Sequence, residues 1–286
     1  MSYEVDQELP IHTVRAFNYA TESSNKIHAD DIAAKLGYRG GLVPGVGVYS
    51  YMTVPIAKEL GKDWLANGTM TAKFINPIYD GETVSIQARV INTDHLRFSI
   101  KAFNEAGELC AIGEAAHPAT EAEAIHLYDY PLGHTPLEHE RLEPDEKKIP
   151  DGHVLGTIEF EFDGEHFQGE SGSFLDDMQE TQKLYRGKKG VLHPALIPHL
   201  ANQILARNVA LGPWIHTASN VRHHAIPEWN ESLSLRGKIS HAYENRGHDI
   251  AVMNLALFGD QERLITHLTH TAIIRPAFLK EEQAAD

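Results

Sequence analysis

The sequence predicts an α+β protein built from two copies of one unit, each a long helix followed by an antiparallel sheet of about four strands. An internal repeat within the 286 residues indicates the two copies. Alternating apolar and polar residues predict the strands, and apolar residues at helical spacing predict a helix ahead of each set of strands. Each half is therefore expected to bury one helix against one sheet.

The repeat consists of two pairs of similar segments. They are GGLVPGVGVYSYM at 40–52 with GVLHPALIPHLAN at 190–202, and WLANGTMTAKFINPIYDGETVSIQARV at 64–90 with WIHTASNVRHHAIPEWNESLSLRGKI at 214–239. Trp64 and Trp214 are 150 residues apart, and Gly41 and Gly190 are 149 apart. An offset this constant over about 40 positions indicates that the two halves share one fold.

The first unit begins with a helix and continues with strands. Apolar residues at helical spacing predict a helix over 43–60, which Pro55 is expected to kink or end. Residues 83–90 alternate between apolar and polar side chains, as a half-buried strand does. Residues 98–103 and 109–115 are predicted as further strands, joined by the turn sequence NEAG.

The second unit follows the same order. Apolar residues predict a helix within 191–211, and alternation predicts a strand over 233–239. Residues 250–258 and 264–274 are predicted to complete its sheet. We expect the two sheets to join into one continuous layer, so that the chain forms a pseudo-dimer.

The boundary between the units falls in a stretch rich in proline and charge. Its prolines are Pro118, Pro131, Pro136, Pro144 and Pro150. Strand-like sequence resumes with TIEFEF just beyond it. We therefore expect a first domain over 1–117, a linker over 118–151 and a second domain over 152–286.

The composition indicates where the protein is located and which classes of binding partner are excluded. The polar N-terminus lacks the features of a signal peptide, and no apolar run approaches the roughly 20 residues of a membrane span. A single cysteine, Cys110, cannot form an intrachain disulfide. These features predict a soluble cytoplasmic protein that does not bind membranes. The net charge of −15 disfavours nucleic acid as a partner, because nucleic-acid binders carry a basic patch.

The 18 histidines do not form a metal motif. His223 and His224 are adjacent and His267 and His270 are three apart, so in strands the members of each pair point to opposite faces. The sequence contains no HExxH motif and no cysteine pair. We expect neither a metal nor a cofactor.

Candidate chemistry lies in TESSNKIHADD at 21–31, just before the first helix. The longer segment FNYATESSNKIHADDIAAKLGYRGGLVPGVGVYSYM at 17–52 resembles the MaoC-like family of (R)-specific enoyl-CoA hydratases and dehydratases, which have the hot-dog fold. The family pattern is roughly Gly-Asp-x-Asn-Pro-x-His-x-Asp, and here Asn25, His28 and Asp30 match it in register. The resemblance implies two tandem hot-dog domains that mimic the dimer of single-domain members.

The resemblance also implies a reaction and residue roles. Water adds to a double bond conjugated to a thioester, and this needs a base that activates the water and an acid that protonates the α-carbon. In the family an Asp and a His that hold one water can share these tasks. His28 corresponds to the acid–base residue of the family, and Asn25 would orient the substrate or a water. The backbone N–H of Gly45, next to Val46 at the start of the central helix, would polarise the thioester carbonyl.

The sequence departs from the family where the second acid should stand. Ser23 occupies the position of the aspartate, Lys26 that of the proline after the asparagine, and Pro44 that of a residue often His or Gln. Three alternatives follow. Glu22 supplies the carboxylate, Ser23 and His28 form a nucleophile–base pair suited to acyl transfer, or the site is inactive.

Two further sets of residues are candidates for substrate contact. His193 precedes the second helix and is expected to face a pocket between the halves. Coenzyme A carries phosphates, so Arg39 before the first helix, or Arg186, Lys188 and Lys189 before the second, are expected at the pocket mouth.

The sequence thus predicts a hydratase- or dehydratase-like enzyme with an altered active site, acting on an acyl thioester such as an acyl-CoA or on a related unsaturated carbonyl compound. The predicted catalytic set is His28, Ser23, Glu22 and Asn25. Thioesterase-type hydrolysis and non-catalytic acyl binding remain alternatives. A homodimer of such double-unit chains is compatible with this organisation.

Overall fold

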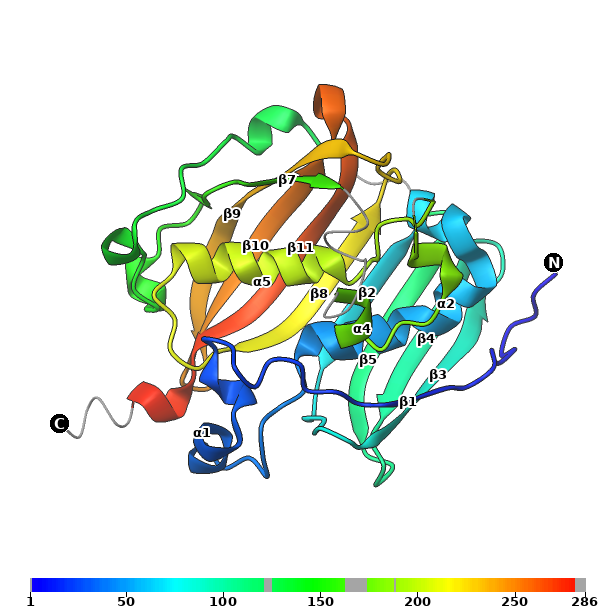
Figure 1. Ribbon diagram of the computed structural model, residues 1–286, viewed down its shortest axis with the longest axis horizontal. Helices are drawn as coiled ribbons and strands as arrows, with labels where there is room; N and C mark the ends of the chain where they lie inside the picture. The colour runs from blue at the N-terminus through cyan, green and yellow to red at the C-terminus, as the bar shows by residue number, and fades with distance from the viewer. Residues whose placement is uncertain (1, 121–124, 163–173, 188, 281–286) are drawn as a thin grey trace.

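The described residues of this computed structural model, 2–120, 125–162, 174–187 and 189–280, contain one antiparallel sheet of eleven strands (Figure 1). The strand order is β1-β3-β4-β5-β2-β8-β11-β10-β9-β6, and β7 pairs with β9 outside this path. Two helices, α2 and α5, lie against the same face of the sheet. The predicted α+β double hot-dog fold is therefore confirmed.

The first half supplies five strands and the longer central helix. Its elements are β1 His12–Arg15, the 3-10 helix η1 Lys26–His28, α1 Asp30–Lys35, α2 Gly45–Asn67, β2 Thr69–Phe74, β3 Thr83–Asn92, β4 Leu96–Phe103 and β5 Leu109–His117. In β3 the apolar side chains of the alternating pattern are buried and face α2. Hydrophobic burial on that face fixes the register of the strand.

Helix α2 is the core of the first half. Every residue from Val46 to Ala57 is buried, so the helix is enclosed by the sheet and by neighbouring segments. Of the two expectations for Pro55, an end to the helix is wrong, because the helix continues through this residue. The interruption is at Gly61, whose φ of 57° and ψ of −138° are outside the helical region and suit glycine.

The second half repeats the arrangement. Its elements are β6 His153–Val154, β7 Ile158–Phe162, α4 Phe174–Asp177, η5 Lys183–Tyr185, α5 Leu196–Asn208, β8 Ile215–His223, β9 Glu231–Asn245, β10 His248–Phe258, η6 Asp260–Glu262 and β11 Leu264–Arg275. Helix α5 is shorter than the predicted 191–211, because the chain turns at Pro194 and becomes extended again at Val209.

The halves join through the strands that follow their central helices. β2 and β8 are antiparallel neighbours, from Thr69 opposite Arg222 to Lys73 opposite Ala218. Helix α2 also contacts β8, so the core of the first half extends onto a strand of the second. The predicted continuous layer is present, and residues at the start of β8 lie beside the first helix.

The region expected as a linker lies over the second half. It contains the 3-10 helices η2 Leu127–Asp129, η3 Glu138–Glu140 and η4 Glu146–Lys148. Leu142 N–H donates to the Asn208 carbonyl at 2.9 Å, and Ala210 N–H donates to the Leu142 carbonyl at 2.8 Å. These bonds fasten the segment to the end of α5.

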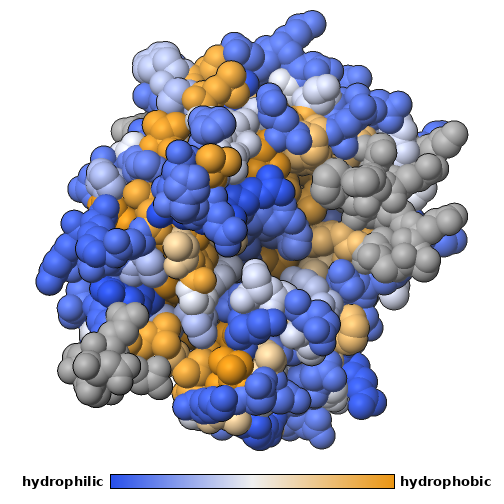
Figure 2. All heavy atoms as spheres, turned by 60° about the vertical axis from the view of Figure 1, so that its left-hand side comes forward, coloured by the Kyte–Doolittle hydropathy of each residue, from blue (hydrophilic) through white to orange (hydrophobic). Residues whose placement is uncertain are grey.

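Polar residues cover most of the face drawn in Figure 2, and apolar residues show between them. This agrees with the net charge of −15. Within the described ranges, no helix is long and apolar enough to cross a membrane.

Candidate active site

A cavity of about 330 Å³ opens at the start of helix α2. Most of its walls are apolar, from the loop before α2, from α2 itself and from the end of β2. Four side chains with polar atoms also line it, and one of them comes from the second half. They are Tyr38, Asn76, Cys110 and His216.

The first turn of α2 presents backbone N–H groups to this region. The first intrahelical bonds run from Gly47 N–H and Val48 N–H to the Pro44 carbonyl, at 2.8 and 3.2 Å. The Gly45 and Val46 N–H groups precede them and have no acceptor within the helix. Together with the helix dipole, they favour negative charge at this end. The Val46 side chain itself is buried in the core rather than in the cavity wall.

Gly45 and His216 approach each other closely across the cavity wall. A Cβ atom on Gly45 would lie 3.0 Å from His216 Nδ1 and 3.1 Å from Phe74 Cε2. The rings of Phe74 and His216 meet edge to face, with centroids 4.8 Å apart. Any larger residue at position 45 would push against the imidazole, so glycine here lets His216 Nδ1 face the helix start.

A β-bulge directs His216 inward. In the pairing of β8 with β11, Ala218 lies opposite Thr271 and His216 lies opposite Ala272, which leaves Thr217 as an extra residue. His216 and Ser219, three apart in sequence, are therefore both buried. In a regular strand residues three apart point to opposite faces.

His216 begins a chain of buried hydrogen bonds that leads away from the cavity. His216 Nε2 lies 2.9 Å from Ser219 Oγ, which lies 2.9 Å from His270 Nδ1. His270 Nε2 lies 2.9 Å from Asn202 Oδ1 on helix α5. The imidazoles of His216 and His270 also stack, with centroids 4.1 Å apart. We call these four residues the His216 relay.

Burial keeps both imidazoles of the relay neutral. It lowers the pKa of His216 to about 3, with the Ala218 backbone opposing the shift, and it lowers the pKa of His270 well below the ordinary value, with the neighbouring His216 adding to the effect. A neutral imidazole carries one N–H and one bare nitrogen. Among the described residues, His216 Nδ1 is buried and has no hydrogen-bond partner.

The loop that carries the family-like motif is fastened to the second half by Asn25. Its Nδ2 donates to the Trp214 carbonyl at 3.0 Å, and its Oδ1 accepts from Trp214 N–H at 3.2 Å and from Ile27 N–H at 3.4 Å. Both ends of the amide are thus bonded to backbone. The predicted role of Asn25 toward a substrate stays a prediction.

His28 is half-buried behind the cavity wall. Its Nδ1 lies 2.7 Å from the carbonyl of Leu42, a residue that lines the cavity, so Nδ1 carries the proton and donates it. Nε2 is then the bare nitrogen, and Asn25 Nδ2 lies 3.5 Å from it. Burial lowers the pKa of His28, and the bond to Leu42 opposes that shift.

Ser23 and Glu22 do not extend this arrangement. The Ser23 hydroxyl donates to the Asn25 carbonyl at 3.1 Å, so its proton points to the loop backbone and not to His28. Glu22 is exposed to solvent. The geometry gives no support to a Ser23–His28 nucleophile–base pair, and a role for Glu22 would require its side chain to turn inward.

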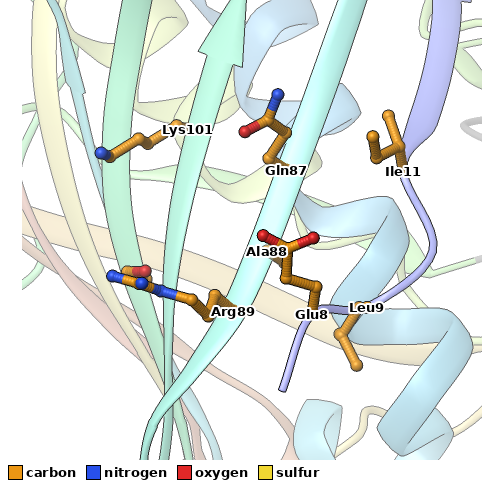
Figure 3. A pocket seen from close by; sticks show the side chains of 8 residues that line it. Glu8, Leu9, Ile11, Gln87, Ala88, Arg89 and Lys101 are labelled. Atoms are coloured by element: carbon orange, nitrogen blue, oxygen red, sulfur yellow. The ribbon is translucent and has the colours of Figure 1, made fainter. Parts of the chain in front are cut away.

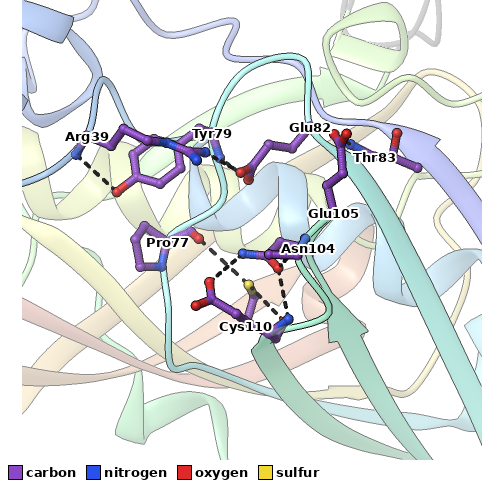
Figure 4. A network of polar contacts seen from close by, with 10 residues as sticks. Arg39, Pro77, Tyr79, Glu82, Thr83, Asn104, Glu105 and Cys110 are labelled. Atoms are coloured by element: carbon purple, nitrogen blue, oxygen red, sulfur yellow. Dashed lines mark hydrogen bonds and ion pairs between the residues drawn. The ribbon is translucent and has the colours of Figure 1, made fainter.

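Arg39 is exposed to solvent beside Tyr79 and Glu82 and is not in the lining of the cavity at α2 (Figure 4). It forms an ion pair with Glu82 and lies over the ring of Tyr79, 4.3 Å from the centroid. Pro77 and Cys110 of the same network line the cavity, and Cys110 Sγ lies 3.7 Å from the Pro77 carbonyl. Burial raises the pKa of the Cys110 thiol to about 11, so it remains protonated at neutral pH.

The candidates from the second half lie elsewhere. His193 is fully buried, with Nε2 3.3 Å from Glu180 Oε2, and it is not in the lining of the cavity at α2. Arg186 pairs with Asp176 at 3.1 Å. Lys188 lies outside the described residues. The expectation that His193 faces a pocket between the halves stays a prediction.

The start of α5, the counterpart of the start of α2, is closed. The cavity there measures about 10 Å³. Its lining positions Leu192, Pro194 and Ile197 correspond to Val43, Gly45 and Val48 at the repeat offset of 149. Mostly apolar side chains fill this space, so among the described residues the end at α2 is open and its counterpart at α5 is not.

Two hollows lie on the outer face of the sheet. One, of about 180 Å³, lies beside the N-terminal segment and is lined by exposed charged or polar side chains that include Glu8, Gln87, Arg89 and Lys101 (Figure 3). The other, of about 550 Å³, is a wider depression across the junction of the halves, lined by residues such as Lys73 and Ile112. A third hollow, of about 480 Å³, is lined by residues of β7, β9 and η6, such as Phe160 and Arg236. None of the three is lined by the N-terminus of an α-helix or by a buried imidazole, so the cavity at α2 is the candidate active site.

Sequence reasoning missed His216, Ser219 and His270 as site residues. A signal was present, because the apolar pattern of the second unit is broken by polar residues in both WIHTASNVRHH and LITHLTHTAII. The strand period alone could not bring His216 and Ser219 to one face, since the bulge at Thr217 has no unambiguous sequence mark.

Comparison with known proteins finds similarity in three-dimensional structure and no match in sequence. No protein-family model and no curated protein sequence matches the chain. A candidate MaoC-domain dehydratase from Chloroflexus aurantiacus is similar over 96% of each chain, with a TM-score of 0.65 and 12% identity. A conserved hypothetical protein from Mycobacterium tuberculosis, described as a double hot-dog fold, covers 95% of this chain and 96% of its own, with a TM-score of 0.64 and 11% identity.

A third solved structure, named as a MaoC-like dehydratase, is similar over 93% of this chain and 98% of its own, with a TM-score of 0.60 and 11% identity. Identities this low establish the fold and leave the activity open. In each comparison nearly all of this chain and nearly all of the other chain are matched. The similarity therefore includes both halves of the chain and the way they are arranged. The chain therefore has the double hot-dog fold that is also found in these MaoC-like structures.

Proposed function

We propose that the chain is a hydratase or dehydratase of an acyl thioester, or of a related unsaturated carbonyl compound, acting in the cavity at the start of α2. The observation that carries the proposal is the asymmetry between the two halves. The helix N-terminus of the first half opens into about 330 Å³, while its counterpart is filled to about 10 Å³. A volume of this size lies at the lower end of the range for small-molecule sites.

The reaction suits the groups at this end of the helix. When hydroxide from water adds to the β-carbon, the thioester carbonyl oxygen gains negative charge. The N–H groups at Gly45 and Val46 and the helix dipole stabilise such a charge. The remaining proton of the water is delivered to the α-carbon, so that one molecule of water is added. From the sequence motif, His28 is the proposed acid–base residue, with its bare Nε2 as the proton acceptor.

Thioester hydrolysis is the second candidate. Ser219, His270 and Asn202 have the order of a nucleophile, a base and an orienting group, with 2.9 Å separations. However, Ser219 is only 3% exposed, and His216 lies between its hydroxyl and the cavity. A serine in this position cannot reach a thioester carbonyl in the cavity at α2 without displacing the imidazole, so hydration is favoured in that cavity.

The test is a panel of enoyl-CoA and saturated acyl-CoA thioesters of increasing chain length. Hydration is followed by loss of the enoyl absorbance, and hydrolysis by release of free thiol. We expect loss of enoyl absorbance without thiol release. Thiol release instead would favour the hydrolase. Tight binding of acyl-CoA with neither change would favour a non-catalytic acyl-binding protein.

A matched pair of variants locates the activity. Val48→Phe places a ring in the open cavity and should abolish turnover with little loss of stability, because the space accommodates it. Ile197→Phe, at the equivalent position, has no space and should lower the free energy of unfolding by about 1–3 kcal/mol while turnover persists below the melting temperature. Equal turnover by Val48→Phe and the unmodified protein would place the reaction elsewhere.

A further inference from the structure

We propose that His216, supplied by the second half, is a catalytic residue that moves the proton in the cavity of the first half, and that Ser219, His270 and Asn202 are its positioning residues. This inference rests on the proposed hydratase or dehydratase function, and it assigns to the second half a direct part in the reaction. It also identifies a group that can do the work of the carboxylate missing at Ser23.

The placement of His216 Nδ1 is the first argument. The atom faces the start of α2, 3.0 Å from where a Cβ of Gly45 would be, and the ring lines the cavity. His216 is only 6% exposed. Its Nδ1 is among the buried polar atoms without a hydrogen-bond partner in the described part of the chain. Buried nitrogens are nearly always bonded, so a partner such as a bound water or substrate group is expected here.

The relay sets the polarity of His216. Asn202 presents Oδ1, an acceptor, to His270 Nε2, which must then carry the proton of that ring. His270 Nδ1 is therefore bare and accepts from the Ser219 hydroxyl. The Ser219 oxygen in turn accepts from His216 Nε2–H. Each imidazole has one proton when neutral, so His216 Nδ1 is left bare and ready to accept a proton in the cavity.

The proposed step balances as follows. His216 Nδ1, in the role of the missing carboxylate, takes a proton from water, while His28 Nε2 accepts the other hydrogen bond of that water and holds it in place. The water oxygen bonds to the β-carbon, and the π electrons move to the thioester carbonyl oxygen beside the Gly45 N–H. The enolate then re-forms the carbonyl, and the proton on Nδ1 passes to the α-carbon. Water has been added and the imidazole is neutral again. Dehydration is the reverse sequence.

The relay and the helix end both lower the cost of the charged intermediate. A buried imidazolium is unfavourable by itself, which is why burial lowers the pKa of His216. During the reaction the enolate oxygen supplies an opposite charge in the same cavity. The hydrogen bond from His216 Nε2–H to the Ser219 oxygen becomes stronger when the imidazole is positively charged. The Ser219 hydroxyl in turn donates to His270, so that part of the positive charge can spread to that ring.

His223 provides a matched control on the same strand. It is also buried, its Nε2 also has no hydrogen-bond partner in the described residues, and burial also lowers its pKa to about 3. It differs in position, because it lines the filled space at the start of α5. A generic effect of removing a buried histidine should therefore appear equally in His216→Asn and His223→Asn.

The experiment compares the full chain with His216→Asn, His223→Asn, Ser219→Ala and Ser219→Thr, using the enoyl-CoA that the unmodified protein turns over fastest. We expect His216→Asn to lose about 10²–10⁴-fold in kcat with KM nearly unchanged, and His223→Asn to keep its kcat. Ser219→Ala should lose about tenfold in kcat, the effect of one hydrogen bond, and Ser219→Thr should restore most of it because the hydroxyl is retained.

The ring polarity is measured separately, from the ¹⁵N chemical shifts of the histidines without substrate. The proposal requires a bare Nδ1 in His216 and a bare Nδ1 in His270. The opposite tautomers, or equal turnover by His216→Asn and the unmodified protein, would overturn it and leave the proposed function standing. No turnover of any thioester by the unmodified protein would instead overturn the proposed function, and this inference with it.

Discussion

The side chain of Asn25 and the backbone of Trp214 exchange two hydrogen bonds, of 3.0 and 3.2 Å, across 189 residues of sequence. Asn25 belongs to the loop of the first half that carries His28. Trp214 lies two residues before His216 of the second half. This pair therefore sets the position of one imidazole-bearing segment relative to the other.

Asn25→Ala should destabilise the protein. It leaves the Trp214 N–H and carbonyl without partners in a buried position, and an unsatisfied buried group costs about 1–3 kcal/mol. We expect a loss of about 2–4 kcal/mol in the free energy of unfolding, measured by urea denaturation. Ser23→Ala is the control, because it removes a single hydrogen bond in the same loop and should cost about 0.5–1.5 kcal/mol. Equal losses for both variants would contradict the role of the pair.

Gly45→Ala should lower activity without lowering stability. Alanine is about 1 kcal/mol more favourable than glycine in a helix, but its Cβ at position 45 would press on His216 at 3.0 Å. Gly47→Ala is the matched change in the same turn, where the nearest atoms lie at 3.6 Å and the contact is ordinary. We expect Gly47→Ala to raise the melting temperature and keep turnover, and Gly45→Ala to reduce turnover. Equal activity of the two variants would show that the His216 position is not sensitive to this contact.

His28→Ala tests the acid–base residue proposed from the motif. Loss of a general acid–base group typically lowers the rate about 10²–10⁴-fold, so kcat on the best enoyl thioester should fall by that factor. Circular dichroism and the melting temperature check that the fold is retained. If kcat is unchanged while His216→Asn is inactive, proton transfer belongs to the second half alone.

Ser23→Asp restores the acid of the family pattern. If the serine merely replaces a lost aspartate, the added carboxylate should raise the hydration rate of an enoyl thioester. Its hydroxyl now donates to the Asn25 carbonyl, so a carboxylate must turn away from that oxygen and toward solvent or the cavity. Ser23→Asn, which has nearly the same size without the charge, is the control. A fall in native activity with both variants would show that the loop conformation depends on the serine.

Lowering the pH should destabilise the protein already at pH values higher than those at which its carboxylates titrate. Burial lowers the pKa of His216 and His223 to about 3, from an ordinary value of 6.5. Below pH 6.5 these histidines therefore bind protons in the unfolded chain and not in the folded chain. The free energy of unfolding is unaffected by them above pH 6.5 and decreases as the pH falls toward 3. Each histidine contributes at most about 1.4 kcal/mol per pH unit in this window. Urea denaturation at pH 7.5, 6.0 and 5.0 measures the slope.

A substitution distinguishes these histidines from the rest of the titration. His223→Gln should flatten the loss of stability between pH 6.5 and 5, because the neutral amide does not bind a proton. His95→Gln makes the same substitution at an exposed position and controls for the change of side chain itself. A free energy of unfolding that stays constant from pH 7.5 to 5 in the unmodified protein would contradict the burial of neutral histidines.

Much of the fold was predictable because each level of the sequence agreed with the others. The repeat at Trp64 and Trp214 indicated two equal units, and the alternation in 83–90 and 233–239 matches strands β3 and β9. The helix predicted over 43–60 corresponds to the regular part of α2, which is interrupted at Gly61. Apolar periodicity reports burial on one face, and burial is what holds these elements in place.

The site was less accessible to sequence reasoning because it depends on contacts between the halves. The partner of Asn25 is 189 residues away, and nothing in the local motif indicates it. The bulge at Thr217 moves His216 and Ser219 to the same face, which the strand period of two excludes. The filling of the space at α5 depends on how apolar side chains pack in three dimensions. The role of His28, by contrast, followed from a local motif and stays a prediction.

The pairing of β2 with β8 joins the two halves within one covalent chain, and this removes a restriction that symmetry imposes. In a dimer of identical units, every substitution occurs twice, so an imidazole gained at one interface position is also gained at the other. Here the repeat offset that relates Trp64 to Trp214 relates His216 to Ala66. One half can therefore lose its cavity and supply a side chain to its neighbour, while the other keeps the cavity. In this chain the cavity at α2 is lined almost wholly by the first half, while the imidazole of His216 in its wall comes from the second.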